Sequence, residues 1–297
     1  MNVSALVHHA YMAQIILGGE AVAAGVVTRH ELGRWYGPVY RGVYARKNTE
    51  LSLRDRAIAA WLASRRNGVV AGMAASALHG APWVDPDVAI ELVGVKIRAQ
   101  EGLIPRTERV ADDEITRVAG LPVTTRVRTA FDLGRHLDRP DALARMDALM
   151  WNQRFSIDEV LALVKRYPRA RGVRQLRELL PLVDGGAESP RESRIRLWLH
   201  DAGFPRPETQ IPVLAGTTRP VAFLDMGWRD FMVAVEYDGD HHRKDRKQYV
   251  KDIARLRMLE ALGWNVIRVI AEDRPDEWLC RVEDALHAAG CGEPFAA

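Results

Sequence analysis

Residues 221–239 read Val-Ala-Phe-Leu-Asp-Met-Gly-Trp-Arg-Asp-Phe-Met-Val-Ala-Val-Glu-Tyr-Asp-Gly, and they predict two neighbouring strands that carry acidic residues. In the first strand, period-two alternation places Asp225 on the face of Phe223. In the second strand, Glu236 and Asp238 share one face. Adjacent carboxylates repel each other unless a cation relieves the repulsion, and a hard metal ion is the usual agent. The stretch therefore predicts an α/β domain with an acidic site.

A predicted helix precedes these strands. Ser189 is a typical N-cap, Pro190 suits the first turn, and Glu192 stands at the third helical position. A capping role is sufficient to explain Glu192, but this residue also lies on the apolar stripe that includes Ile195. Both roles stay open, and Glu192 joins the acids of the two strands as a candidate site residue.

A helix with Glu192, a strand ending in Asp225 and a second strand with Glu236-x-Asp238 resemble the core of the PD-(D/E)XK nuclease superfamily. The likeness continues in the segments Glu236-Tyr237-Asp238-Gly239-Asp240-His241-His242 and Gly263-Trp264-Asn265-Val266-Ile267-Arg268. Residues 186–273 resemble the very-short-patch-repair-like endonuclease domain known as domain of unknown function family 559.

This resemblance implies hydrolysis of DNA phosphodiester bonds with Mg²⁺, or with Mn²⁺ in its place. The residues that it implies as metal ligands are Glu192, Asp225, Glu236 and Asp238. His241 or His242 would move the proton.

One position departs from the nuclease pattern. The superfamily has a lysine two residues after the glutamate, and this chain has Asp238 there. Either His241, His242, Lys251 or Arg255 takes over the role of that lysine, or the site is inactive. An alternative explanation of the acids is structural, since Glu236 and Asp238 could neutralise Arg268 or face Arg255.

The front of the chain predicts a DNA-binding motif. Apolar spacing predicts a helix over residues 3–17, and Thr28 with Glu31 predicts a second, capped helix over residues 29–35. Residues 38–47 alternate apolar and basic side chains around one glycine, which predicts a two-stranded wing on phosphates or an ordinary solvated hairpin.

Residues 20–135 resemble the N-terminal domains of AbiEi-type antitoxin proteins, which are winged-helix transcriptional regulators. The segments that carry this likeness are Gly25-Val26-Val27-Thr28-Arg29, Arg41-Gly42-Val43-Tyr44, Ala74-Ala75-Ser76-Ala77-Leu78-His79-Gly80 and residues 125–133. The segment between Leu32 and Tyr40 is short for a full recognition helix, so base readout by this domain is not expected.

The glycines at positions 185 and 186 follow a long helical region and mark a domain boundary. The sequence thus predicts a multi-domain α/β protein with three parts. They are a winged-helix-like DNA-binding domain at 1–90, a mainly helical AbiEi-like middle region at 91–185, and a PD-(D/E)XK-like, restriction-endonuclease-like domain with a mixed central sheet at 186–297. Residues 165–177 hold six basic side chains and no acidic one, as a solvated face or a phosphate track would.

Composition limits the class of protein. The chain has 297 residues, of which 47% are hydrophobic, and this excludes a disordered chain. A formal net charge of +3 is too small to establish a nucleic-acid partner, so local clusters of charge must decide. Two cysteines exclude a disulfide framework. Without an apolar run of about 18 residues or a cationic signal-peptide start, we expect a cytoplasmic protein that does not span a membrane.

Two functions remain at this stage. The first is a Mg²⁺-dependent DNA endonuclease with an attached DNA-binding domain. The alternative is a non-catalytic DNA-binding transcriptional regulator or antitoxin-like protein, with a degenerate nuclease fold and a toxin as its partner. The side chains expected to contact the DNA backbone are Arg29, Arg41, Arg46, Lys47, Lys244, Lys247, Lys251 and Arg255.

Overall fold

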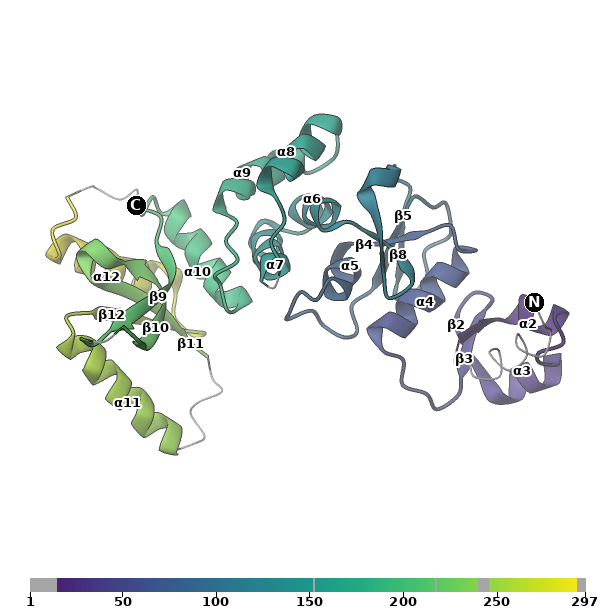
Figure 1. Ribbon diagram of the computed structural model, residues 1–297, viewed down its shortest axis with the longest axis horizontal. Coiled ribbons are helices and arrows are strands. Elements are labelled where there is room, and N and C mark those ends of the chain that lie inside the picture. The colour runs from purple at the N-terminus through teal and green to yellow at the C-terminus, as the bar shows by residue number, and fades with distance from the viewer. Residues whose placement is uncertain (1–14, 152, 217, 240–245, 293–297) are drawn as a thin grey trace. The chain divides into compact units, whose positions relative to one another are not determined.

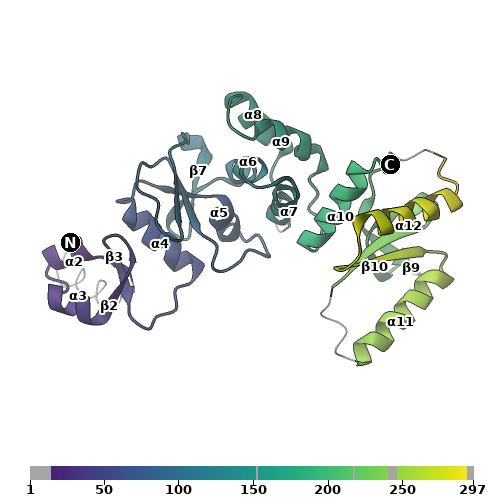
Figure 2. The same cartoon turned by 180° about the vertical axis from the view of Figure 1, so that it is seen from behind.

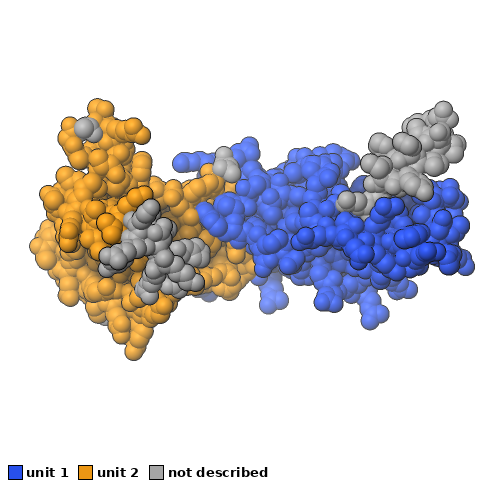
Figure 3. Space-filling view, turned by 90° about the horizontal axis from the view of Figure 1, so that it is seen from below, with its two compact units in different colours: residues 1–136, 152–177 blue, residues 137–151, 178–297 orange. Residues whose placement is uncertain are grey.

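The structure is a computed structural model that describes residues 15–151, 153–216, 218–239 and 246–292 (Figure 1). The chain divides into two compact units (Figure 3). The first unit contains residues 1–136 and 152–177, and the second contains residues 137–151 and 178–297. Each unit mixes helices and strands, as the sequence predicts. None of the described helices is long and apolar enough to cross a membrane.

The first unit begins with a three-stranded antiparallel sheet and two short helices. Its elements are β1 (Ile15–Leu17), α2 (Gly18–Ala23), α3 (Arg29–Trp35), β2 (Tyr36–Tyr40) and β3 (Val43–Arg46), in the strand order β1-β3-β2. Thr28 and Glu31 form the predicted capping box of α3, with the Thr28 Oγ1 accepting from the Glu31 amide at 3.1 Å. The predicted wing is the hairpin of β2 and β3.

The prediction of a helix over residues 3–17 is wrong for its last three residues. Residues 15–17 form β1, which pairs with β3. Ile16 is buried in one apolar cluster while Ile15 and Leu17 pack against another, and a strand between two cores buries both faces in this way. Residues 3–14 of that predicted helix lie outside the described residues.

A five-stranded sheet forms the main core of the first unit. The elements that build it are α4 (Leu53–Ala63), β4 (Val69–Ala71), α5 (Gly72–Leu78), β5 (Ile90–Val93), β6 (Leu103–Arg106), β7 (Ile115–Val118) and β8 (Leu121–Thr124). The strand order is β6-β5-β4-β8-β7, with parallel pairs β5–β6 and β4–β8. Strands from both sides of residue 90, where the sequence places a domain boundary, belong to this one sheet.

Strand β4 ends at Ala71, and α5 begins at the next residue. The turn into α5 occurs at Gly72, whose φ is +59°. A Cβ at this position would lie 2.1 Å from the Glu91 Oε1, so only glycine fits here.

The mainly helical region predicted for residues 91–185 is α-helical only from residue 126, because β5 to β8 lie within residues 90–124. Its helices are α6 (Arg126–His136), α7 (Arg139–Met150), α8 (Ile157–Arg166) and α9 (Val173–Leu179). Helix α6 belongs to the first unit, whereas α7 belongs to the second. In the second unit, α7 packs against α10 (Pro190–Asp201), and a buried ion pair of 2.5 Å joins Asp147 to Arg196.

The rest of the second unit is a four-stranded mixed sheet with helices on both faces (Figures 1 and 2). Its further elements are β9 (Glu208–Leu214), β10 (Pro220–Trp228), β11 (Val233–Asp238), α11 (Arg246–Ala261), β12 (Asn265–Ile270) and α12 (Pro275–Ala288). The strand order is β12-β11-β10-β9, with β11 and β12 parallel and the other pairs antiparallel. One apolar cluster packs α10 and α12 against the sheet, and a second packs α11 against it.

Candidate functional site

The connection between β10 and β11 places the predicted acids. A short 3₁₀ turn and Met232, whose φ is +52°, separate the two strands, so the hairpin is wider than a two-residue turn. The strands pair from Trp228–Val233 to Met226–Val235. The next step of this register sets Asp225 across from Glu236. The placement of Asp225 across from Glu236 therefore depends on this wide connection between β10 and β11.

The Asp225 carboxylate accepts a hydrogen bond from a backbone amide of β11, where a backbone carbonyl of β10 would otherwise accept it. Its Oδ2 accepts a hydrogen bond of 2.9 Å from the Tyr237 amide, one step beyond the last regular pair of β10 and β11. Burial, as the main cause, and the negative charges of Glu192 and Glu236 together raise the pKa of this carboxyl to about 7, against the lowering effects of the Tyr237 amide and of Arg255. Two of the other three acids of the predicted site, Glu192 and Glu236, therefore act electrostatically on Asp225.

Glu192 performs part of its predicted capping role. The Ser189 Oγ accepts from the Glu192 amide at 3.2 Å, which confirms the N-cap. The Glu192 carboxylate accepts at 2.7 Å from the Glu188 amide, one residue before the expected Ser189 amide. Its burial raises its pKa. Among the described residues, neither Glu192 nor Asp225 forms an ion pair.

The other two acids have cationic partners. Glu236 receives two hydrogen bonds from Arg255, at 2.6 and 2.8 Å, and Arg255 also donates to the Phe223 carbonyl at 2.7 Å. Asp238 forms an ion pair of 2.5 Å with Arg268. Both pairs are those of the structural alternative. Arg255, expected on the DNA backbone, directs its guanidinium at Glu236.

A hollow of about 320 Å³ is lined by three of the four acids, Asp225, Glu236 and Asp238, but not by Glu192. The other residues that line it are Tyr237, Asp252, Arg255, Leu256 and Arg268. Carboxylate oxygens are the ligands that Mg²⁺ prefers, so the donor set fits a divalent cation. The fit is incomplete, however, because two guanidinium groups already neutralise Glu236 and Asp238. Among the described residues, three potential metal ligands lie within 4.8 Å of one another at a different place in the chain. They are Glu108, Asp132 and His136.

We expect Asp225→Asn to flatten the pH dependence of stability. The pKa of Asp225 is raised from 3.8 to about 7 on folding, so the folded state keeps a proton that the unfolded chain has released. The resulting stability is fully present below about pH 4 and is lost as the pH rises to about 7, by up to about 4 kcal/mol. Urea denaturation at both ends of this range measures the loss. An equal loss in wild type and variant would contradict the placement of Asp225.

The remaining residues predicted at this site are only partly described. His241, His242 and Lys244 lie outside the described residues. Lys247 belongs to α11, and its side chain is likewise not described. Lys251 is exposed on the same helix.

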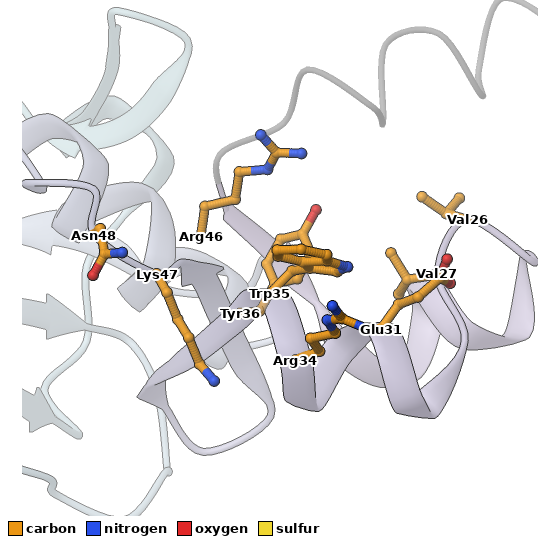
Figure 4. A pocket seen from close by; sticks show the side chains of 9 residues that line it. All are labelled: Val26, Val27, Glu31, Arg34, Trp35, Tyr36, Arg46, Lys47 and Asn48. Atoms are coloured by element: carbon orange, nitrogen blue, oxygen red, sulfur yellow. The ribbon is translucent and has the colours of Figure 1, made fainter.

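A second candidate surface lies at the front of the chain. The residues predicted to bind DNA there are all exposed: Arg29 at the start of α3, and Arg41, Arg46 and Lys47 on the hairpin. A pocket of about 630 Å³ beside them is lined by Trp35, which is 54% exposed, together with Arg34 and Arg46 (Figure 4). The Arg34 guanidinium lies 4.8 Å from the indole centroid. The sequence analysis missed Trp35 and Arg34, although an exposed tryptophan beside arginines is typical of nucleic-acid contacts.

A buried network of charges on α6 was also missed. Arg128 is paired with Glu114 and, at 3.1 Å, with Asp132, while Arg135 is paired with Asp132 at 2.9 Å and with Glu108. Hydrogen bonds from His136 and Arg135 lower the pKa of Glu108 to about 2, against the effect of its burial. Guanidinium groups therefore neutralise the carboxylates of the Glu108, Asp132 and His136 group. The four-residue spacing of Arg128 and Asp132, which places them on one face of a predicted helix, was the available signal.

Comparisons with known proteins locate the family likeness. Residues 68–182 match the AbiEi antitoxin C-terminal domain family. Two uncharacterised Mycobacterium tuberculosis proteins, MT2308 of strain CDC 1551 and Rv2248 of strain H37Rv, are each 33% identical over 237 residues, which is 79% of this chain and 85% of each relative. The expected likeness to AbiEi-type proteins is confirmed, but it concerns their C-terminal domain and begins at residue 68. The nuclease likeness of residues 186–273 stays a prediction.

Proposed function

The chain belongs to the family of the uncharacterised Mycobacterium tuberculosis proteins MT2308 and Rv2248, and we propose that it is a DNA-binding regulator of the antitoxin type. The observation that carries this proposal is the match of residues 68–182 to the AbiEi antitoxin C-terminal domain. In the chain, this segment comes after the capped helix α3, the basic hairpin of β2 and β3, and α4. A toxin protein is the partner that the match suggests.

The hairpin of β2 and β3 supplies the DNA contact in this proposal. Arg41, Arg46 and Lys47 are exposed, and among the described residues none of their charged groups pairs with a carboxylate. Helix α3 has only seven residues, so it offers little length for base readout in the major groove. Affinity therefore comes mainly from phosphates, with Trp35 and Arg34 beside the hairpin as further contacts.

Replacing three charges of the hairpin tests where DNA binds. We expect the triple variant R41Q/R46Q/K47Q to bind a duplex about tenfold or more weakly at low salt, because about three phosphate contacts are lost. Fluorescence anisotropy with a labelled duplex measures the affinity. The control variant R117Q/R154Q/R257Q removes the same charge from exposed positions elsewhere and should bind like the wild type. Equal weakening by both triple variants would place the binding surface elsewhere.

A metal-dependent DNA endonuclease is the second candidate function. The observation that favours it is the approach of Glu192 and Glu236 to Asp225, which raises the pKa of Asp225 to about 7 together with burial. In this reading the acids of the site hold Mg²⁺ or Mn²⁺, with Asp238 assisting. The bound metal would activate water and stabilise charge on the leaving oxygen. The pairs with Arg255 and Arg268 and the missing lysine instead favour a degenerate nuclease fold.

Glu192→Gln separates the two readings of the acidic site. An amide keeps the acceptor for the Glu188 amide but loses the charge that a hard cation needs. If the site is a nuclease, the variant abolishes Mg²⁺-dependent plasmid cleavage and the rise in melting temperature on adding Mg²⁺. The control Ser189→Ala should cost about 1 kcal/mol through the lost cap and leave cleavage intact. Wild-type protein that neither cleaves nor gains stability from Mg²⁺ or Mn²⁺ would rule out the nuclease function while leaving DNA binding untouched.

A further inference from the structure

The first unit has a pocket of about 460 Å³ that six arginines line: Arg109, Arg128, Arg135, Arg166, Arg169 and Arg171. We call it the arginine pocket. Phe131, Tyr167 and Pro168 supply apolar lining. This volume lies within the range of small-molecule sites. The pocket includes the loop from α8 to α9, whose basic run the sequence analysis left as either a solvated face or a phosphate track.

Three of the arginines are fixed by the buried network. Glu114 pairs with Arg128 and, at 2.8 Å, with Arg166, and it also accepts a hydrogen bond of 2.7 Å from the Tyr167 hydroxyl. Arg135 pairs with Asp132 and Glu108. These contacts hold the guanidinium groups in place before any ligand binds, so a ligand does not have to order them.

One donor of this fixed set has no partner. The side chain of Arg135 is 1% exposed, and its Nε is buried without a hydrogen-bond acceptor among the described residues. Buried donors without an acceptor are rare in folded proteins. Because this atom is buried, a ligand in the arginine pocket cannot reach it, and the charged groups that a ligand meets are those of the exposed arginines.

The other three arginines are exposed and unpaired. Across the part of the chain that the structure describes, the guanidinium groups of Arg109, Arg169 and Arg171 make no hydrogen bond or ion pair. Four carboxylates pair with arginines of the pocket: those of Glu108, Asp113, Glu114 and Asp132. Since six arginines line the pocket, two positive charges are in excess. A ligand that fits this excess carries about two negative charges on closely spaced oxygens.

We propose that the arginine pocket binds a phosphate monoester, with its phosphoryl group on Arg109, Arg169 and Arg171 and its organic group against Tyr167 and Pro168. A monoester carries about −1.5 to −2 charges and three strong acceptor oxygens, which matches the excess charge and the forked donors of arginine. A phosphodiester, as in the DNA backbone, has one charge and two such oxygens and matches less well. This site is separate from the proposed DNA contact at the hairpin.

Isothermal titration calorimetry on the intact chain tests the proposal with three probes: inorganic phosphate, adenosine 5′-monophosphate and dimethyl phosphate. We expect one molecule of phosphate or of the monoester to bind, and the diester to bind about tenfold or more weakly. The double variant R169Q/R171Q should weaken monoester binding by about tenfold or more. Both side chains are exposed and unpaired, so this variant should keep the stability of the wild type.

Arg177→Gln is the matched control, because Arg177 is exposed in the same basic run but does not line the pocket. It should bind the monoester like the wild type. Three results would overturn the proposal. They are no binding of phosphate or monoester at millimolar concentration, equal weakening by R177Q and R169Q/R171Q, and equal affinity for the diester and the monoester. The last result, joined with displacement by duplex DNA, would make the pocket a contact for the DNA backbone.

Discussion

Arg128→Met is expected to lower the free energy of unfolding by about 3–5 kcal/mol, because two buried carboxylates, Glu114 and Asp132, each lose one of their two guanidinium partners. The Arg128 side chain is 2% exposed, and its partners Glu114 and Asp132 are 3% and 4% exposed. Methionine has a similar length but supplies no charge and no donor. Urea denaturation followed by circular dichroism measures the change.

Arg66→Gln is the control for this prediction. Arg66 pairs with Glu20 at 2.7 Å, but the two side chains are 44% and 60% exposed. Solvent screens such a pair, so its loss should cost no more than about 1 kcal/mol. If Arg128→Met cost no more than Arg66→Gln, the network on α6 would not hold the first unit together.

Gly172→Ala should lower the free energy of unfolding by about 2–5 kcal/mol, which is the second large effect that the structure predicts. Gly172 has a φ of +80°, and a Cβ there would lie 2.0 Å from the Arg135 carbonyl oxygen. The new methyl group must therefore move the loop before α9 away from α6. Thermal and urea denaturation of the intact chain measure the loss.

Gly80→Ala separates the steric overlap from the backbone strain. Gly80 has a φ of +86°, and a Cβ there would meet nothing within 4 Å. This substitution should therefore cost only the left-handed conformation, about 1–2 kcal/mol. Equal losses in the two variants would show that Gly172 does not lie against α6 as described.

Local signals predicted much of the fold. Thr28 with Glu31, and Ser189 before Glu192, gave the starts of α3 and α10, because an N-cap needs only residues within one helical turn. The strand alternation around Glu236 likewise depends on neighbouring residues alone, and β11 follows it. The likeness to AbiEi-type proteins could be predicted from the sequence because the segments that carry it are short and local. The start of the matched domain at residue 68 was not predicted.

Contacts between distant segments could not be read from the sequence. The strand β1 depends on pairing with β3, about 30 residues away, and its apolar spacing was equally compatible with a helix. Arg255 was predicted to contact the DNA backbone, but in the structure it pairs with Glu236. The sequence alone does not show whether this side chain faces Glu236 or solvent. Two of the three partners of Arg128, Glu108 and Glu114, lie outside its own helix, so its role depends on the packing of the first unit.

The affinity of the intact chain for duplex DNA over a series of salt concentrations tests the DNA-binding function most directly. If Arg29, Arg41, Arg46 and Lys47 each neutralise a phosphate, a plot of log affinity against log salt should have a slope of about −3 to −4. Fluorescence anisotropy on a labelled duplex gives this slope. A slope near zero, or no binding at the lowest salt concentration, would contradict the proposal that this protein is a DNA-binding regulator.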